Sequence, residues 1–76
     1  MQYVAYIEET ATGYSAYLPD VPGCVAASDT LAGVQRLLGE ALDLHLRGLI
    51  EDGEPLPVNR TSSYAVSAPD DLMLCG

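Results

Sequence analysis

The sequence predicts a small α+β domain in which three strands are followed by one long helix and a fourth strand. Residues 3–9 and 14–18 are short runs rich in β-branched and aromatic side chains, joined by a glycine-containing turn. Residues 31–51 carry apolar side chains at helical spacing. The length of 76 residues and the 49% hydrophobic content indicate one folded domain and exclude intrinsic disorder.

The first two strands are expected to form a hairpin. Gly13 ends the connection between them, a place where a positive φ is often required, so we expect a turn with a bulge. Alternation along the first strand gives it two faces: Tyr3, Ala5 and Ile7 on one, Val4 and Tyr6 on the other. Because both faces are apolar and the chain has one helix, one face of the sheet should stay open for a partner or a second copy.

A sharp turn should end the second strand. Pro19 and Pro22 remove backbone donors, and Pro22-Gly23 is a strong turn signal. Residues 24–28 then form a short third strand, and either Asp29 or Thr30 should cap the helix that follows.

The long helix over residues 31–51 should bury one apolar side. Its opposite side holds two i,i+4 pairs of opposite charge, Arg36 with Glu40 and Asp43 with Arg47, as expected of a solvated face. Gly53 provides the left-handed residue that ends the helix, and the prolines that follow prevent its continuation.

The fourth strand is predicted over residues 60–66. Since the first three strands meander and the helix returns across one face, this strand should run parallel to the first strand and beside it, giving a mixed sheet. We expect the domain to cover residues 1–68 and a short tail to cover residues 69–76.

The charge balance restricts the partners. Eleven acidic residues face three arginines and no lysine, for a net charge of −8, so direct nucleic-acid binding is not expected. No apolar run is long enough to cross a membrane. The acidity suits a basic protein partner, and the alternative is that it only keeps the domain soluble.

No catalytic or metal site is predicted, and no cofactor. Cys24 and Cys75 are far apart and lie in no metal-binding motif. His45, the only histidine, falls on the apolar side of the helix, where a neutral core histidine is the usual role. Because no leader segment is recognised, we expect a cytoplasmic protein with reduced thiols, a disulfide being the alternative.

Two segments resemble the HicB antitoxin family. One is Pro19-Asp20-Val21-Pro22-Gly23-Cys24 with the helix start at residues 28–30, and the other is Glu51-Asp52-Gly53-Glu54-Pro55-Leu56-Pro57 at the helix end. The structural motif that carries over is Pro19, Asp20, Pro22, Gly23, Asp29, Thr30 and Gly53. The resemblance implies a partial, degenerate ribonuclease-H-like fold that binds and masks HicA, a small basic toxin that cleaves mRNA. Nuclease activity is not expected, because residues 60–66 supply no carboxylate for a two-metal site.

The resemblance leaves other functions open. Many HicB antitoxins carry a C-terminal DNA-binding segment, and this chain ends ten residues after the predicted fourth strand, which puts operator binding in doubt. The main alternative is an orphan HicB-like homo-oligomer, dimeric or tetrameric, with a regulatory or structural role. A small enzyme that uses His45 is the third hypothesis.

Residues for partner contact are predicted where aromatic anchors lie beside acidic side chains. These are Glu8, Glu9, Tyr6, Tyr17 and Asp20. The alternative is that they serve only turn formation and sheet packing.

Overall fold

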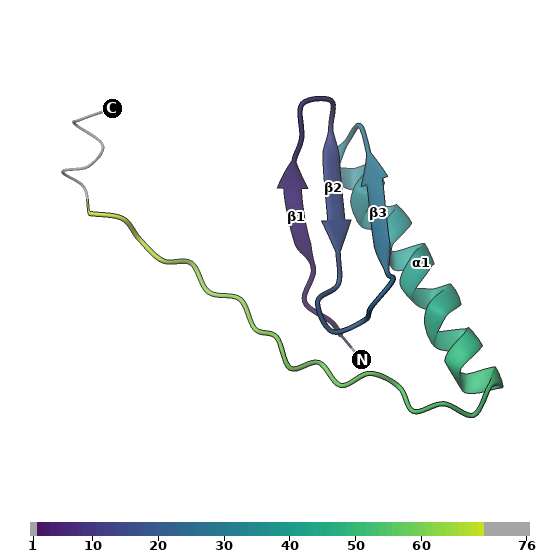
Figure 1. The fold of residues 1–76 in the computed structure, drawn as a ribbon. Helices are drawn as coiled ribbons and strands as arrows, with labels where there is room; N and C mark the ends of the chain where they lie inside the picture. Colours follow the sequence, from purple (N-terminus) through teal and green to yellow (C-terminus); the bar gives the residue numbers. More distant parts are fainter. Residues whose placement is uncertain (1, 70–76) are drawn as a thin grey trace.

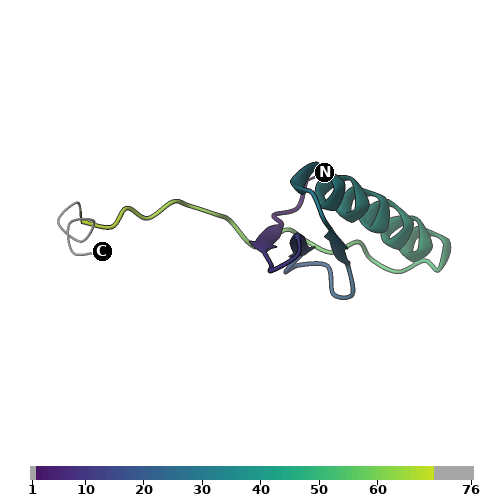
Figure 2. The same cartoon turned by 90° about the horizontal axis from the view of Figure 1, so that it is seen from above.

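The computed structural model describes residues 2–69 and has three strands followed by one helix (Figure 1). The elements are β1 (Tyr6–Glu9), β2 (Tyr14–Tyr17), β3 (Val25–Ser28) and α1 (Leu31–Glu51). The strands form one antiparallel sheet in the order β1-β2-β3. Seen from above, α1 lies on one side of this sheet (Figure 2). The α+β class with one helix on one face is therefore confirmed. Within residues 2–69, no helix combines the length and apolarity needed to span a membrane.

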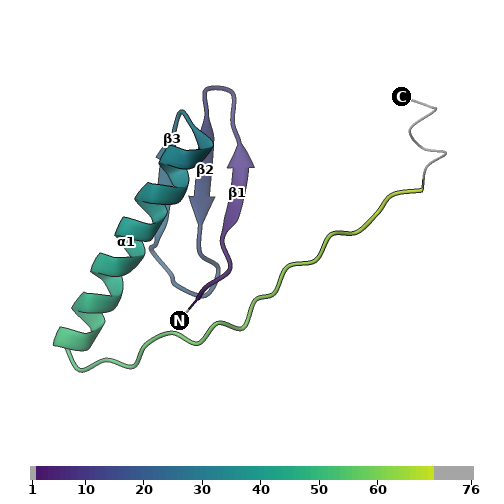
Figure 3. The same cartoon turned by 180° about the vertical axis from the view of Figure 1, so that it is seen from behind.

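The helix covers only part of the sheet. It contacts β3 and β2 but not β1, so one edge of the helix-facing side stays open (Figure 3). In the register, Tyr6 lies opposite Tyr17 and Ile7 opposite Ala16. Ala16 is buried beneath the helix, and because side chains alternate along a strand, the two tyrosines point to the other face.

The core is small and apolar. Its buried members are Ala16, Leu18, Val21, Cys24, Val34 and Leu38. Three of them come from the turn between β2 and β3, which is held by backbone hydrogen bonds from Val21 N to Leu18 O and from Cys24 N to Val21 O, each 3.2 Å. Gly23 makes this turn possible with a φ of +86°. The Pro-Asp-x-Pro-Gly-Cys motif therefore fills part of the core.

The helix begins and ends where the sequence predicts. Thr30, not Asp29, is the N-cap, and its Oγ1 accepts a hydrogen bond of 3.0 Å from Gly33 N. Gly53 has a φ of +72° just beyond the C-cap. Both expected ion pairs are present at the exposed face, with N···O distances of 3.3 Å and 2.9 Å, and such pairs add at most a few tenths of a kcal/mol each.

The prediction of a fourth strand is wrong, because the structure of the single chain has none over residues 60–66. Residues 60–66 pair with no strand in the described part, so the sheet is antiparallel and not mixed. Hydrogen bonds hold the chain near the start of β1 at residues 57–61, and it then runs away from the sheet (Figure 1). The first strand is also shorter than predicted, because it begins at Tyr6.

The expectation of a positive φ at Gly13 is also wrong, because among residues 2–69 only Gly23 and Gly53 have one. Gly13 is instead required by space. A Cβ there would overlap Ser28 O and lie 2.7 Å from Asp29 Cα.

The domain boundary at residue 68 stays a prediction. Residues 70–76, most of the predicted tail, and Cys75 with its alternative disulfide lie outside the described residues.

Candidate protein-binding surface

The outer sheet face, the side of the sheet that α1 does not cover, carries exposed aromatic and aliphatic side chains. Tyr6 and Tyr17 are 47% and 45% exposed, and their rings contact each other with centroids 5.4 Å apart. Val25 lies opposite Tyr17 in the neighbouring strand and is 65% exposed. Rings that are already in contact with each other lose little conformational freedom when a partner binds. The outer sheet face is therefore suited to protein recognition.

Acidic side chains flank this face at one end of β1. Glu8 is on the same side of β1 as Tyr6, and Glu9 follows it on the helix side. Both are exposed, and within residues 2–69 neither carboxylate has a hydrogen-bond or ion-pair partner. The helix acids Glu40 and Asp43, by contrast, are paired with arginines. The structure thus brings Tyr6, Tyr17 and Glu8 together on one face, with Glu9 at its margin.

Asp20 has a different place in the fold. Its Oδ2 accepts hydrogen bonds of 2.8 Å from the backbone N–H groups of both Arg60 and Thr61. Nearby, the Tyr3 hydroxyl donates to Pro57 O at 2.6 Å, and Val4 N donates to the Asn59 side chain at 3.3 Å. Asp20 thereby attaches the chain after the helix to the turn between β2 and β3.

These hydrogen bonds change the acidity of Asp20. The Thr61 amide, with a smaller contribution from the Arg60 amide, lowers the pKa of the Asp20 carboxyl below its ordinary 3.8, and partial burial opposes this. A folded-state pKa below the unfolded value means that the stabilisation is present at neutral pH. It is lost as the pH falls through the folded-state pKa.

We expect the attachment to open in acid. On titration from pH 7 downward, the Thr61 amide chemical shift of the native chain should change with a midpoint below 3.8, the ordinary pKa of an aspartate. In Asp20→Asn this transition should disappear, while in Glu54→Gln, which alters an exposed carboxylate without a partner, it should persist. NMR spectra of the three proteins give the comparison. An unchanged Thr61 titration in Asp20→Asn contradicts the assignment.

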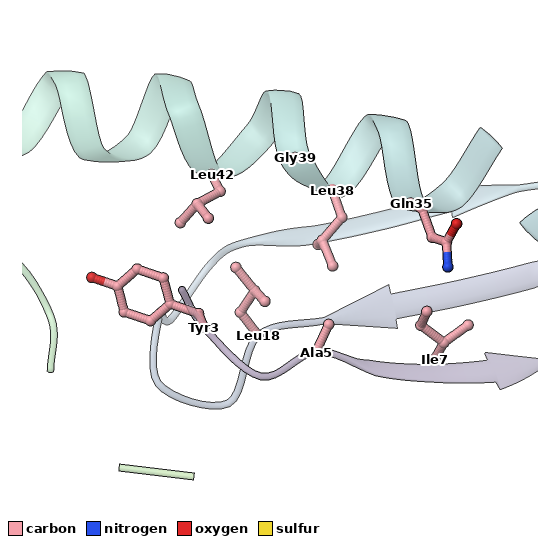
Figure 4. A pocket seen from close by; sticks show the side chains of 8 residues that line it. All are labelled: Tyr3, Ala5, Ile7, Leu18, Gln35, Leu38, Gly39 and Leu42. Carbon is pink, nitrogen blue, oxygen red and sulfur yellow. The ribbon is translucent and has the colours of Figure 1, made fainter. Parts of the chain in front are cut away.

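An apolar groove lies between β1 and α1, where the helix does not reach the edge of the sheet. Its volume is about 280 Å³. Figure 4 shows side chains from the helix and from the β1 side pointing into it. The groove is lined by Tyr3, Ala5, Ile7, Leu18, Gln35, Leu38, Gly39 and Leu42. Sequence reasoning did not find this groove, and its one signal was a glycine, Gly39, in mid-helix with no neighbour that requires it.

The remaining candidates from the sequence are Cys24 and His45. Cys24 is buried in the core, and desolvation raises the pKa of its thiol, which keeps it protonated and a poor nucleophile. His45 is half-buried on α1 and lies outside the buried core. The prediction of a core histidine is therefore correct in its partial burial but not in its membership of the core. Among the described residues, no cluster of three or more His, Cys, Asp or Glu side chains could hold a metal ion.

Comparisons with known proteins identify a family and several similar proteins. A family model described as HicB-like antitoxin of bacterial toxin-antitoxin system matches residues 3–72. An uncharacterised 14.9 kDa protein in the rep-hol intergenic region of Haemophilus phage HP1 (strain HP1c1) is 37% identical over 70 residues, which are 92% of this chain and 53% of that protein. The chain thus spans about half the length of this curated relative.

Two solved structures are similar. A chain of the HicA3 and HicB3 toxin-antitoxin complex is 33% identical with a TM-score of 0.65, covering 79% of this chain and 70% of that chain. The crystal structure of antitoxin HicB3 has a TM-score of 0.64, covering 96% of this chain and 77% of that chain. At 20% identity, this second likeness shows the fold alone.

Proposed function

The chain belongs to the HicB-like antitoxin family of bacterial toxin-antitoxin systems, and on this premise we propose that it binds a HicA-type toxin in the cytoplasm and inhibits RNA cleavage by that toxin. The observation that supports this most directly is the likeness to a chain of a toxin-antitoxin complex. The inhibition is by binding and needs no catalysis.

The outer sheet face is the part of the domain best suited to the toxin. Tyr6 and Tyr17 offer large, rigid contact areas of the kind that dominate binding energies. The unpaired carboxylates of Glu8 and Glu9 add negative potential beside them, which attracts a basic protein and speeds association. We therefore place the toxin contact over β1 and β2, with the acidic end of β1 at its margin.

Charge reversal at the end of β1 should weaken the complex. We expect Glu8→Lys/Glu9→Lys to raise the Kd for a HicA-type toxin by about tenfold or more, equivalent to about 1.4 kcal/mol. The matched control is Glu51→Lys/Glu54→Lys, which makes the same change in net charge at two exposed positions, the last residue of α1 and the third residue beyond it. Calorimetry and an RNA-cleavage assay, each at low and high salt, give the affinities and the inhibition.

The control separates a local contact from a general charge effect. The control variant should bind within about threefold of the native chain, since screening confines charge effects to about 10 Å at ordinary ionic strength. Equal weakening by both variants would place the contact elsewhere. Absence of a complex even at low salt would contradict the proposed function itself and favour the orphan homo-oligomer.

A further inference from the structure

The last described residues form a segment that is exposed along its whole length. Residues 62–69, here called the C-terminal arm, are extended and exposed, with Tyr64 at 86% and Val66 at 78% (Figure 1). The Cα radius of gyration of 16.0 Å exceeds the value of about 11 Å expected for a compact chain of this length. These are the two most exposed large apolar side chains of the described residues, and a surface that covered them would remove them from water.

The sheet has an unfilled place of matching shape. β1 is an edge strand that pairs only with β2, so the backbone groups along its other edge have no strand partner within residues 2–69. The apolar groove runs along this same edge, with Ala5 and Ile7 on one side and Leu38 and Leu42 on the other. An added strand at the β1 edge would satisfy the backbone groups and place side chains over the groove.

The arm has the pattern that such a strand needs. In an extended segment Tyr64 and Val66 point to one side, and Ser63 and Ala65 point to the other. Residues 62–69 contain no charged side chain, so seating them against the apolar groove desolvates no charge. The groove, at about 280 Å³, has room for large side chains of this kind.

We propose that two copies of this chain exchange their arms, each arm pairing with β1 of the other copy and seating Tyr64 and Val66 in its groove. The hydrogen bonds from Arg60 and Thr61 to Asp20 fix the point where the arm leaves the domain. Beyond that point the chain diverges from its own β1 (Figures 1 and 3), which directs it to a second copy. Reciprocal exchange of identical elements is a low-cost route to a symmetric dimer.

Exchange of the arms also adds buried surface, which a small domain lacks. A chain of this length buries only about 60% of its unfolded surface, and association is a common source of further stability. In this arrangement the groove is complete only when the second copy provides the arm. The outer sheet face, with Tyr6 and Tyr17, is on the other side of the sheet and stays accessible.

The first experiment measures the mass of the full chain by light scattering. We expect 16 kDa, twice the 8.0 kDa of one chain, or 32 kDa if dimers pair further. Tyr64→Asn/Val66→Asn should give 8.0 kDa, and the matched control Ser63→Asn/Ala65→Asn should remain associated. Helical circular dichroism should be equal in all three, because these side chains touch no core residue. A monomeric native chain, or equal dissociation by both variants, overturns the proposal.

The second experiment distinguishes exchange from closure of the arm on its own domain. In a Cys75→Ser background, an unlabelled chain carrying Glu9→Cys is mixed and refolded with a ¹⁵N-labelled chain carrying Ser67→Cys, and a flexible thiol crosslinker is added. Cys24 is buried and unreactive. Mass spectrometry should find labelled chains joined to unlabelled chains. A chain carrying both cysteines that crosslinks only within itself overturns the proposal, and neither experiment depends on a toxin.

Discussion

Replacing Leu38 by alanine is expected to lower the free energy of unfolding by about 2–5 kcal/mol. Leu38 is 6% exposed and belongs to a core of six buried side chains, so the cavity left by the substitution has few neighbours that can move in to fill it. Since small domains have total stabilities on the order of 5 kcal/mol, a loss at the upper end of this range leaves a substantial unfolded fraction at 25 °C. Urea denaturation followed by helical circular dichroism measures the change.

The matched control is on the same helix. Leu44 is 71% exposed, so Leu44→Ala removes the same atoms from a position that buries little surface and should change stability by no more than about 0.5 kcal/mol. Both variants must be measured at one protein concentration, because association would add to the apparent stability. Similar losses in the two variants would show that the helix packs in a different orientation.

The helix was the most predictable element because its signals are local. Thr30 caps the N-terminus through a bond to a residue three positions away, and Gly53 with the prolines after it ends the C-terminus. Such contacts are fixed by the order of residues along the chain. The two faces of β1 were predictable for the same reason, since alternation alone puts Tyr6 on the face opposite Ile7, whereas the pairing of Tyr6 with Tyr17 depends on the register.

Features that depend on distant contacts were not predictable. The run from residue 60 to 66 is extended as its composition indicates, but alternation does not say which strand edge it joins, and in the single chain it joins none. Asp20 accepts hydrogen bonds from backbone groups 40 and 41 residues away, and no local pattern indicates such distant partners. From the sequence alone, Asp20 was therefore predicted to contact a partner together with the tyrosines. The groove exists because the helix crosses β3 and β2 and not β1, a packing angle that no local pattern specifies.

Gly13→Ala should destabilise the protein by about 1–3 kcal/mol, as overpacking does in well-packed sites. The added Cβ would overlap Ser28 O and approach Asp29 Cα to 2.7 Å, and both are backbone atoms that cannot rotate aside. The position of Ser28 is also fixed by the sheet and the helix, since it pairs with Tyr14 and ends β3 two residues before the helix cap Thr30. Relief of the overlap therefore requires separation of the hairpin from the start of the helix.

Gly48→Ala, by contrast, should raise the free energy of unfolding. Gly48 is inside α1 with no atom within 4 Å of an added Cβ, so alanine gains about 0.5–1 kcal/mol through its better helix propensity. Because the two substitutions are chemically identical, their difference isolates the local backbone environment from any general effect of alanine. Thermal unfolding of both variants beside the native chain measures it. A neutral or stabilising Gly13→Ala would mean that the hairpin turn does not pack against the end of β3.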